Sequence, residues 1–155
     1  MFCGLRKDNG KVFLEETRHE FATEARKTGK IRRMKAIDGT DRTFLFLQGP
    51  HGPYVRRLAR MLSASGAQVW RVGFNMGDQV FWHDARTYIP FTDSQDAWPE
   101  RIRAILTEKG VTDLVLYGDT RFIHAEAVRA AQEAGVMVHV FEEGYLRPYW
   151  ISYER

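Results

Sequence analysis

The sequence contains one cysteine, Cys3, among 155 residues, so no disulfide within the chain can stabilise its fold. Such cysteine usage is typical of a reducing compartment, and we expect a cytoplasmic protein. No apolar run approaches the roughly 20 residues that a membrane-spanning helix requires. Residues 1–5 lead directly into charge, without the apolar stretch of a secretory signal. Any contact with a membrane is therefore expected to be peripheral, on its cytoplasmic face.

Recognisable motifs for metal ions and nucleotides are also lacking. The five histidines show no paired ligand spacing, so we expect no metal site. The glycine-rich stretch QGPHGP, residues 48–53, matches neither the GxGxxG pattern of a dinucleotide site nor the GxxxxGKS/T pattern of a P-loop, and its two prolines lack backbone N–H donors. This stretch is either a tight strand-to-helix turn or a helix start that faces an anion. We expect no cofactor.

The net charge of +3 is small but unevenly distributed. Residues 1–42 contain 11 Lys or Arg against 7 Asp or Glu, which leaves 12 against 13 for residues 43–155. Six basic residues and no acid lie between Arg26 and Lys35. We interpret residues 1–42 as a basic, poorly ordered arm, with binding to an anionic membrane surface as the alternative. Nucleic acid is not expected as a partner, because the basic run lacks interleaved aromatics and residues 43–155 are not basic.

Four stretches share one pattern, in which a run of Val, Leu and Phe ends in a cluster of glycine and polar residues. They are TFLFLQGPHGP (43–53), QVWRVGFNMGD (68–78), DLVLYGDTRFIH (113–124) and VMVHVFEEGYLRP (136–148). Near-continuous apolar runs are typical of strands that are buried on both faces of a parallel sheet. The pattern predicts parallel strands near residues 43–47, 68–74, 113–117 and 136–141.

Helical periodicity occupies the segments between these runs. One helix is expected to begin after Gly52, with Pro53 in its first turn. Two further helices are expected over residues 94–110 and 122–134. A short strand is expected over residues 87–89. Strands that alternate with helices of about 12 residues predict an α/β domain over residues 43–155, with a Rossmann-like, mostly parallel sheet and flanking helices.

Polar side chains follow each predicted strand, and ligands in open α/β sheets bind beyond the carboxyl ends of the strands. We therefore expect these residues to form one site. The candidates for catalysis, as general acid, base or nucleophile, are Asp119, His124, Glu142 and Glu143. The candidates for substrate binding are Gln48, Gly49, His51, Asn75, Arg121 and Arg147. Of these, Arg147 suits bidentate binding of a phosphate or carboxylate.

Several candidates also have a structural alternative. Glu142 and Glu143 are consecutive in a strand, so their side chains point to opposite sides and one of them is expected to enter the site. The alternative is that they cap a loop and pair with Arg147. His124 is either a site residue or a structural cap at the start of a helix. His139, inside the last predicted strand, is expected to be a sheet histidine with a satisfied ring rather than a metal ligand.

A resemblance to a known family rests on the stretches FLQGPHGPYVRRLAR, FNMGD, DLVLYGDTRFIH and VHVFEEGYLRPYWISYER. In order and spacing, from about Thr43 to Arg155, they resemble the amino-terminal half of bacterial capsule polysaccharide biosynthesis and export proteins. These are β-Kdo transferases that build the lipid-linked Kdo primer of capsules. The resemblance implies a cytoplasmic, membrane-associated glycosyltransferase with two Rossmann-like domains, resembling the GT-B architecture. An enzyme of this family is expected to take Kdo from CMP-Kdo and to pass it to a phospholipid or Kdo-primed lipid acceptor.

The same resemblance implies that this chain is incomplete as an enzyme. Members of the family are more than twice as long, and their CMP-Kdo donor is expected chiefly on a second domain. We therefore expect the chain to correspond to the amino-terminal half and to be inactive alone, with residues 1–42 unmatched. The alternative function is that of a non-catalytic Rossmann-like domain that binds a sugar phosphate or a lipid head group.

Overall fold

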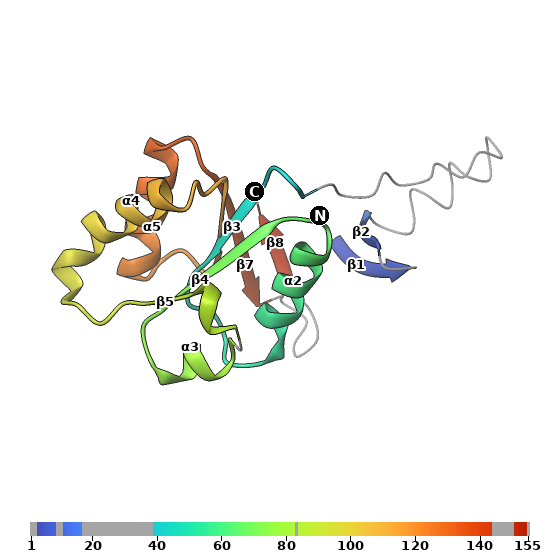
Figure 1. The fold of residues 1–155 in the computed structure, drawn as a ribbon, viewed down its shortest axis with the longest axis horizontal. Helices are drawn as coiled ribbons and strands as arrows, with labels where there is room; N and C mark the ends of the chain where they lie inside the picture. The colour runs from blue at the N-terminus through green and yellow to red at the C-terminus, as the bar shows by residue number, and fades with distance from the viewer. Residues whose placement is uncertain (1–2, 9–10, 17–38, 83, 144–150, 155) are drawn as a thin grey trace.

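A computed structural model describes residues 3–8, 11–16, 39–82, 84–143 and 151–154 of the chain. The described residues form a six-stranded sheet with helices on both faces and a separate antiparallel hairpin, made of β1 (Cys3–Asp8) and β2 (Lys11–Glu16) (Figure 1). The hairpin lies where the sequence analysis expected a poorly ordered arm. The basic run from Arg26 to Lys35 lies outside the described residues.

The sheet has the strand order β5-β4-β3-β6-β7-β8 and confirms the expected α/β class. The predicted strands are confirmed as β3 (Thr43–Phe46), β4 (Gln68–Gly73), β6 (Asp113–Tyr117) and β7 (Met137–Glu143), with β4-β3-β6-β7 all parallel. The expected short strand is present as β5 (Tyr88–Pro90), parallel to β4. The last strand, β8 (Ile151–Glu154), was not predicted and runs antiparallel to β7.

The predicted helices are confirmed as α2 (Pro53–Ala64), α4 (Trp98–Glu108) and α5 (Phe122–Glu133). Pro53 occupies the first helical position of α2, as expected. The structure adds short elements that the periodicity did not show, namely α3 (Met76–Val80) and the 3-10 turns η1 (Ala85–Thr87) and η2 (Gln95–Ala97). Each contains too few residues to display a helical repeat.

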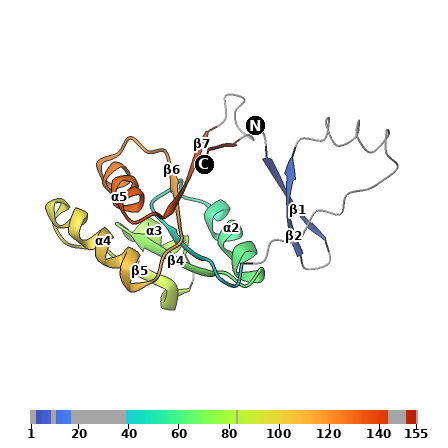
Figure 2. The same ribbon diagram turned by 90° about the horizontal axis from the view of Figure 1, so that it is seen from above.

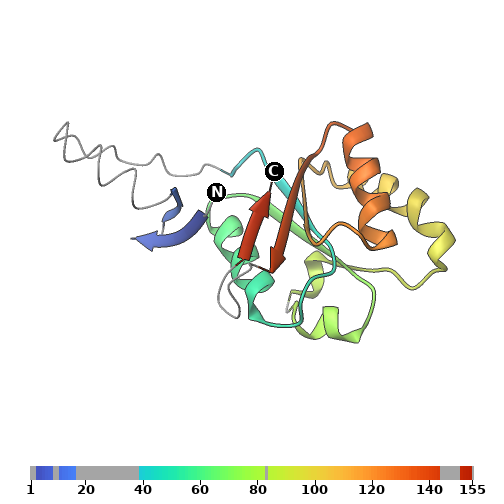
Figure 3. The same ribbon diagram turned by 180° about the vertical axis from the view of Figure 1, so that it is seen from behind.

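The helices cover opposite faces of the sheet, α2 on one face and α4 with α5 on the other (Figures 2 and 3). Side chains of a strand alternate between faces, so Phe44 and Phe46 pack towards α2, whereas Leu45 and Leu47 pack towards α4 and α5. Trp98 is fully buried in this second layer. Because both faces are covered, the strands carry the near-continuous apolar runs seen in the sequence.

A buried carboxylate, Asp113, ties together the amino ends of the central strands. It accepts hydrogen bonds from Nε of Arg42 at 2.9 Å and from the Thr112 hydroxyl at 2.7 Å, and Nη2 of Arg42 forms an ion pair with it. His139 on β7 bonds to Asp113 through Nε2 at 2.7 Å. Nδ1 of His139 lies 2.7 Å from the Tyr153 hydroxyl on β8. His139 is therefore the satisfied sheet histidine that was predicted.

These contacts shift the proton affinity of Asp113. Burial raises the pKa of its carboxyl, but the hydrogen bonds from His139, Arg42 and Thr112, with the charge of Arg42, outweigh burial and lower the pKa from 3.8 to about 2. The folded protein thus binds this proton more weakly than the unfolded chain. The resulting stabilisation, on the order of 2 kcal/mol, is present above the unfolded pKa and is lost as the pH falls from about 4 towards 2.

We expect Asp113→Asn to lower the free energy of unfolding by about 2 to 4 kcal/mol at pH 7, because the amide offers no negative charge to Arg42. Urea denaturation followed by circular dichroism at pH 7 and pH 3 measures the effect, and the deficit should shrink at pH 3. The exposed Asp93→Asn is the control, with an expected change within about 0.5 kcal/mol. A deficit of equal size at both pH values would contradict the prediction.

Candidate functional site

The parallel strands end at one edge of the sheet, and the candidate residues follow those ends. Strand pairing aligns Phe46 of β3 with Arg71 of β4 and Val115 of β6, and it aligns Tyr117 of β6 with Phe141 of β7. The candidates that come two residues after the last residue of β3, β4 and β6 are Gln48, Asn75 and Asp119. We call this the carboxyl edge, and it is where ligands of open α/β sheets bind.

Gln48 links two of these segments through its side-chain amide. Its Oε1 accepts a hydrogen bond from Nη1 of Arg121 at 2.9 Å, and its Nε2 donates to Oδ2 of Asp78 at 3.4 Å. Arg121 is the N-cap residue of α5, which follows β6. The contact therefore joins the segments after β3 and β6, and it brings together two predicted substrate-binding residues, Gln48 and Arg121.

Asp78 and Arg71 form a buried ion pair beneath this contact. Oδ1 of Asp78 accepts from Nη2 of Arg71 at 2.9 Å, and Oδ2 accepts from the backbone N–H of Phe74 at 3.0 Å. Asp78 is fully buried, Arg71 is 1% exposed, and the guanidinium lies 5.8 Å from the ring centroid of Trp82. Arg71 was not among the predicted site residues. The sequence contains one indication of this ion pair, the single charge inside the apolar run QVWRVG. A charge in a buried strand requires a partner, so Arg71 predicts a buried counter-ion nearby.

Two predicted substrate-binding residues, Asn75 and His51, hold α3 in place. Oδ1 of Asn75 caps the helix by accepting a hydrogen bond from the backbone N–H of Asp78 at 3.0 Å. The His51 ring stacks on Phe81, with 5.9 Å between the ring centroids. A Cβ atom at Gly77 would lie 2.6 Å from Nε2 of His51, so α3 approaches this ring closely. Both residues therefore have structural partners at the carboxyl edge.

His124 lies in the first turn of α5 and is fully buried. Its Nδ1 donates to the carbonyl of Gly118 at 2.7 Å, and its Nε2 has no hydrogen-bond partner in the described part of the chain. Burial lowers the pKa of the imidazole and outweighs the hydrogen bond to the Gly118 carbonyl, which raises it. The charge of Arg121 lowers this pKa further, against smaller opposing contributions from Gln48 and Asp119. The neutral ring anchors the turn after β6, which favours the structural alternative. Asp119, in contrast, is exposed at the edge.

The remaining candidates lie at or beyond the ends of β3 and β7. Glu142 is exposed on β7 and is paired with Ser152 of β8. Glu143 is the last residue of β7, but its side chain lies outside the described part, as does Arg147. Gly49 is half-buried and lies three residues after the end of β3. Of the four predicted catalytic residues, Asp119 and Glu142 therefore present exposed carboxylates.

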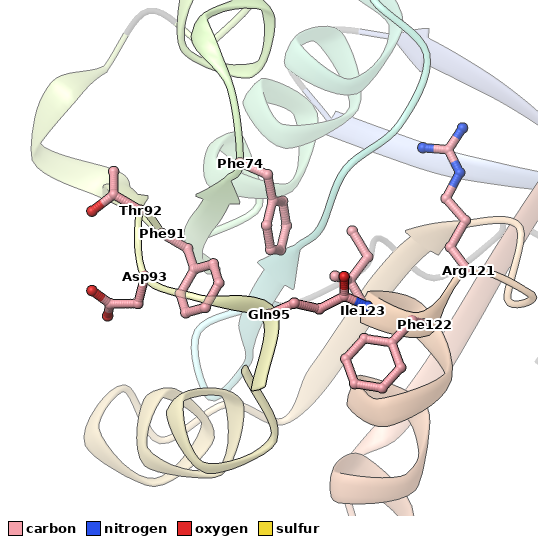
Figure 4. A pocket seen from close by; sticks show the side chains of 8 residues that line it. All are labelled: Phe74, Phe91, Thr92, Asp93, Gln95, Arg121, Phe122 and Ile123. Atoms are coloured by element: carbon pink, nitrogen blue, oxygen red, sulfur yellow. The ribbon is translucent and has the colours of Figure 1, made fainter. Parts of the chain in front are cut away.

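A hollow of about 440 Å³ opens at the carboxyl edge, between the segments after β4 and β5 and the start of α5. Its lining residues are Phe74, Phe91, Thr92, Asp93, Gln95, Arg121, Phe122 and Ile123. Figure 4 shows the rings of Phe74, Phe91 and Phe122 around it, with the Arg121 guanidinium directed away from the Phe122 ring. Phe74 and Phe91 pack edge-on against Trp98, at 4.9 and 5.1 Å between centroids. Sequence reasoning identified only Arg121 among these residues.

This arrangement suits a ligand that carries an anionic group beside a ring or apolar face. Arg121 and the positive end of the α5 dipole attract anions. The phenylalanine rings offer an apolar surface, and Phe122 is 43% exposed. The exposed carboxylates of Asp93 and Asp119 accept hydrogen bonds from hydroxyl groups. A sugar acid or a sugar phosphate combines all three features.

Comparison with known proteins shows what the sequence resembles. Residues 112–155 match the family described as capsule polysaccharide biosynthesis protein. By sequence, the chain is similar to capsule polysaccharide proteins. Over 112 residues it is 40% identical to the capsule polysaccharide modification protein LipB of Neisseria meningitidis, in serogroups A and B alike. Over 111 residues it is 35% identical to the capsule polysaccharide export protein KpsS of Escherichia coli.

The alignments cover 72% of this chain, but only 27% of each LipB sequence and 28% of KpsS. The chain therefore spans about a quarter of the length of these relatives. A solved structure, UDP-GlcNAc 2-epimerase from Methanocaldococcus jannaschii, aligns with a TM-score of 0.49 and 13% identity, over 62% of this chain and 29% of that chain.

In the described residues, no helix combines the length and apolar character needed to cross a membrane.

We expect Asp78→Asn to lower the free energy of unfolding by about 3 kcal/mol, because it leaves the Arg71 cation buried without a countercharge. The control is Glu108→Gln, which removes the carboxylate of the more exposed pair Arg101–Glu108 and should cost less than about 1 kcal/mol. Urea denaturation of both variants measures the difference. Equal losses in the two variants would show that burial of the Asp78 pair has no special effect.

A second prediction concerns the pH dependence of stability. Because folding lowers the pKa of His124, protonation favours the unfolded chain, so this contribution is complete above about pH 6.5 and is lost as the pH falls through the lower folded-state pKa. His124→Asn keeps an N–H for the Gly118 carbonyl but does not titrate. Its free energy of unfolding should change less between pH 7 and pH 5 than that of the wild type.

The control for this measurement is Gln132→Asn, which changes an exposed residue of the same helix and removes no titratable group. This variant should retain the wild-type pH dependence between pH 7 and pH 5. A wild-type pH dependence in His124→Asn would overturn the assignment.

Proposed function

We propose that this chain contains part of the amino-terminal half of a β-Kdo transferase of capsule biosynthesis, which moves Kdo from CMP-Kdo to a lipid or Kdo-primed acceptor. The observation that carries the proposal is where the family match falls on the structure. Residues 112–155 begin at β6, and they include Asp119 and Arg121 at the carboxyl edge and Glu142 on the adjoining strand. The matched part therefore includes several of the polar candidates, whereas Gln48 and Asn75 lie before it.

In this proposal, Arg121 binds the acidic group of the sugar or the phosphate of the lipid acceptor. Its contact with Gln48 holds the guanidinium before the ligand arrives, which lowers the entropy cost of binding. The exposed carboxylates, Asp119 and Glu142, are the candidates for hydrogen bonding to sugar hydroxyls or for accepting the proton of the attacking hydroxyl. His124 supports the loop that carries Asp119.

The donor CMP-Kdo binds, in this proposal, chiefly to a second domain of the GT-B type. The chain spans about a quarter of the length of its capsule relatives, which leaves ample sequence for such a domain. The protein works at the cytoplasmic face of the inner membrane, in peripheral contact with it, where a lipid acceptor is accessible. The competing function is a domain that binds a sugar phosphate or lipid head group without chemistry, and the burial of His124 favours it by removing one catalytic candidate.

The test incubates the purified chain with CMP-Kdo and a Kdo-primed lipid, alone and together with the carboxyl-terminal part of a capsule relative, and detects the product by mass spectrometry. We expect no transfer by the chain alone and transfer by the mixture. Turnover by the chain alone on the order of 1 per second would show that one half is sufficient and would refute the two-domain proposal. Binding of the lipid acceptor without transfer in the mixture would favour the non-catalytic alternative.

Within the active mixture, we expect Arg121→Gln to reduce transfer by roughly 10- to 100-fold, because the ligand then loses a charged, pre-oriented partner. Arg129→Gln is the matched control, since Arg129 lies on the same helix, is exposed and pairs with Glu126 and Glu133. Its rate should remain within about twofold of the wild type. Similar losses in both variants would assign the effect to overall charge instead of to the carboxyl edge.

A further inference from the structure

Helix α3 exposes its apolar side chains and buries its charged one. Asp78 is fully buried, whereas Met76 and Val80 are 72% and 67% exposed. Met76 and Val80 are four residues apart and therefore lie on one side of the helix, away from Asp78. We call this pair of exposed side chains the α3 face. A surface helix normally buries its apolar side and exposes its charges, so the arrangement in α3 is reversed.

Exposed apolar side chains of the described residues are concentrated at the carboxyl edge. Large apolar side chains are exposed there at three positions, Met76, Val80 and Phe122. Helix α3 follows β4, and Phe122 begins α5 after β6, so all three lie beyond the carboxyl ends of parallel strands. Figure 1 shows α3 at the lower margin of the molecule, away from α4 and α5. Exposed apolar residues that gather at one edge, unlike scattered ones, mark an interaction surface.

Several contacts fix the orientation of α3. The helix is five residues long, which is too short to be stable on its own. Asp78 is paired with the buried Arg71, and Asn75 caps the first turn. The ring of Phe81, at the other end of the helix, stacks on His51. The fold thus uses a buried ion pair, which is costly to desolvate, to hold a helix whose apolar side faces solvent.

The chemistry of the α3 face suits a protein surface. Helix α3 contains no Lys or Arg, and the exposed polar side chains beside the face, Asn75 and Gln79, are neutral. Helices that bind membranes combine an apolar side with basic residues, and α3 has none. The centres of protein interfaces, in contrast, are depleted of charge and enriched in methionine and aromatic residues.

The capsule relatives indicate which protein surface this is. The alignments cover 27% of each LipB sequence and 28% of KpsS, so about three quarters of each relative lies outside them. We propose that the α3 face docks against a part of the longer capsule proteins that lies outside the aligned region. The inference rests on the two-domain arrangement of the proposed function, and it adds the surface through which the two parts meet. Contacts between domains are commonly about 600 to 1,500 Å² in area, so the α3 face forms one portion of the interface.

The test produces the full chain, carrying an affinity tag, in the same cells as the carboxyl-terminal part of LipB. Production in one cell allows the LipB part to fold against its partner. The tagged chain is then purified, and the LipB part that remains bound is quantified by mass spectrometry. We expect the LipB part to be retained in an amount comparable to that of the chain. Absence of retention would overturn the proposal.

Variants of α3 show whether binding uses this face. Val80→Lys and Met76→Lys each place a charge where the interface excludes water, and each should reduce retention by roughly tenfold or more. The matched control is Gln132→Lys, which adds the same charge to an exposed residue at the far end of α5. It should retain the LipB part within about twofold of the wild type. Equal retention by the control and both α3 variants would overturn the proposal.

Folding of the variants is checked by urea denaturation, and their midpoints should match that of the wild type because both positions are exposed. Two further measurements address other occupants of the face. A dimer of the chain in sedimentation velocity that Val80→Lys dissociates would assign the face to a second copy. Co-sedimentation with phosphatidylglycerol vesicles that Val80→Lys abolishes would assign it to a membrane. Either result would overturn the proposed occupant.

The retention measurement needs no CMP-Kdo, so this inference and the proposed function fail separately. Retention that depends on Val80, without Kdo transfer by the mixture, would support the docking surface and count against the transferase. Transfer by the mixture that Val80→Lys leaves unchanged would support the transferase and overturn the docking surface.

Discussion

The carboxylate of Asp78 has no access to water, and this constraint organises the carboxyl edge. Arg71 lies beside it, because an isolated buried charge would destabilise the fold strongly. Oδ2 of Asp78 accepts hydrogen bonds from the backbone N–H of Phe74 and from the side-chain amide of Gln48. Since the amide nitrogen of Gln48 is engaged there, its oxygen faces Arg121. One buried ion pair thus orients polar groups on neighbouring loops before any ligand is present.

Much of the fold could be predicted from the sequence, because apolar runs and helical repeats report burial directly. The parallel strands and the long helices followed from these patterns alone. β8 could not be predicted, since it is four residues long and its position depends on pairing with β7 and on the contact between Tyr153 and His139. The short helix α3 depends in the same way on partners distant in sequence, such as the ring of His51.

The proximity of some candidate residues could be predicted from the sequence, but their hydrogen-bond partners could not. The rule that ligands bind beyond strand ends correctly brought Gln48 and Arg121 to one edge. It did not show that Asn75 is engaged as a helix cap or that the His124 ring is enclosed. A sequence shows where a residue lies along a strand, whereas the direction of its hydrogen bonds depends on groups that the fold alone brings near. The aromatic lining of the adjoining hollow, including Phe91, was missed for this reason.

The outer strand β5 has a consequence for the behaviour of the protein at high concentration. It is three residues long and ends in Pro90, which has no N–H to offer another strand. Exposed sheet edges are templates on which strands of other molecules add, and short, proline-terminated edges resist this. The side of the sheet next to the hollow lined by Phe91 is thereby protected against the edge-to-edge association that leads to aggregation.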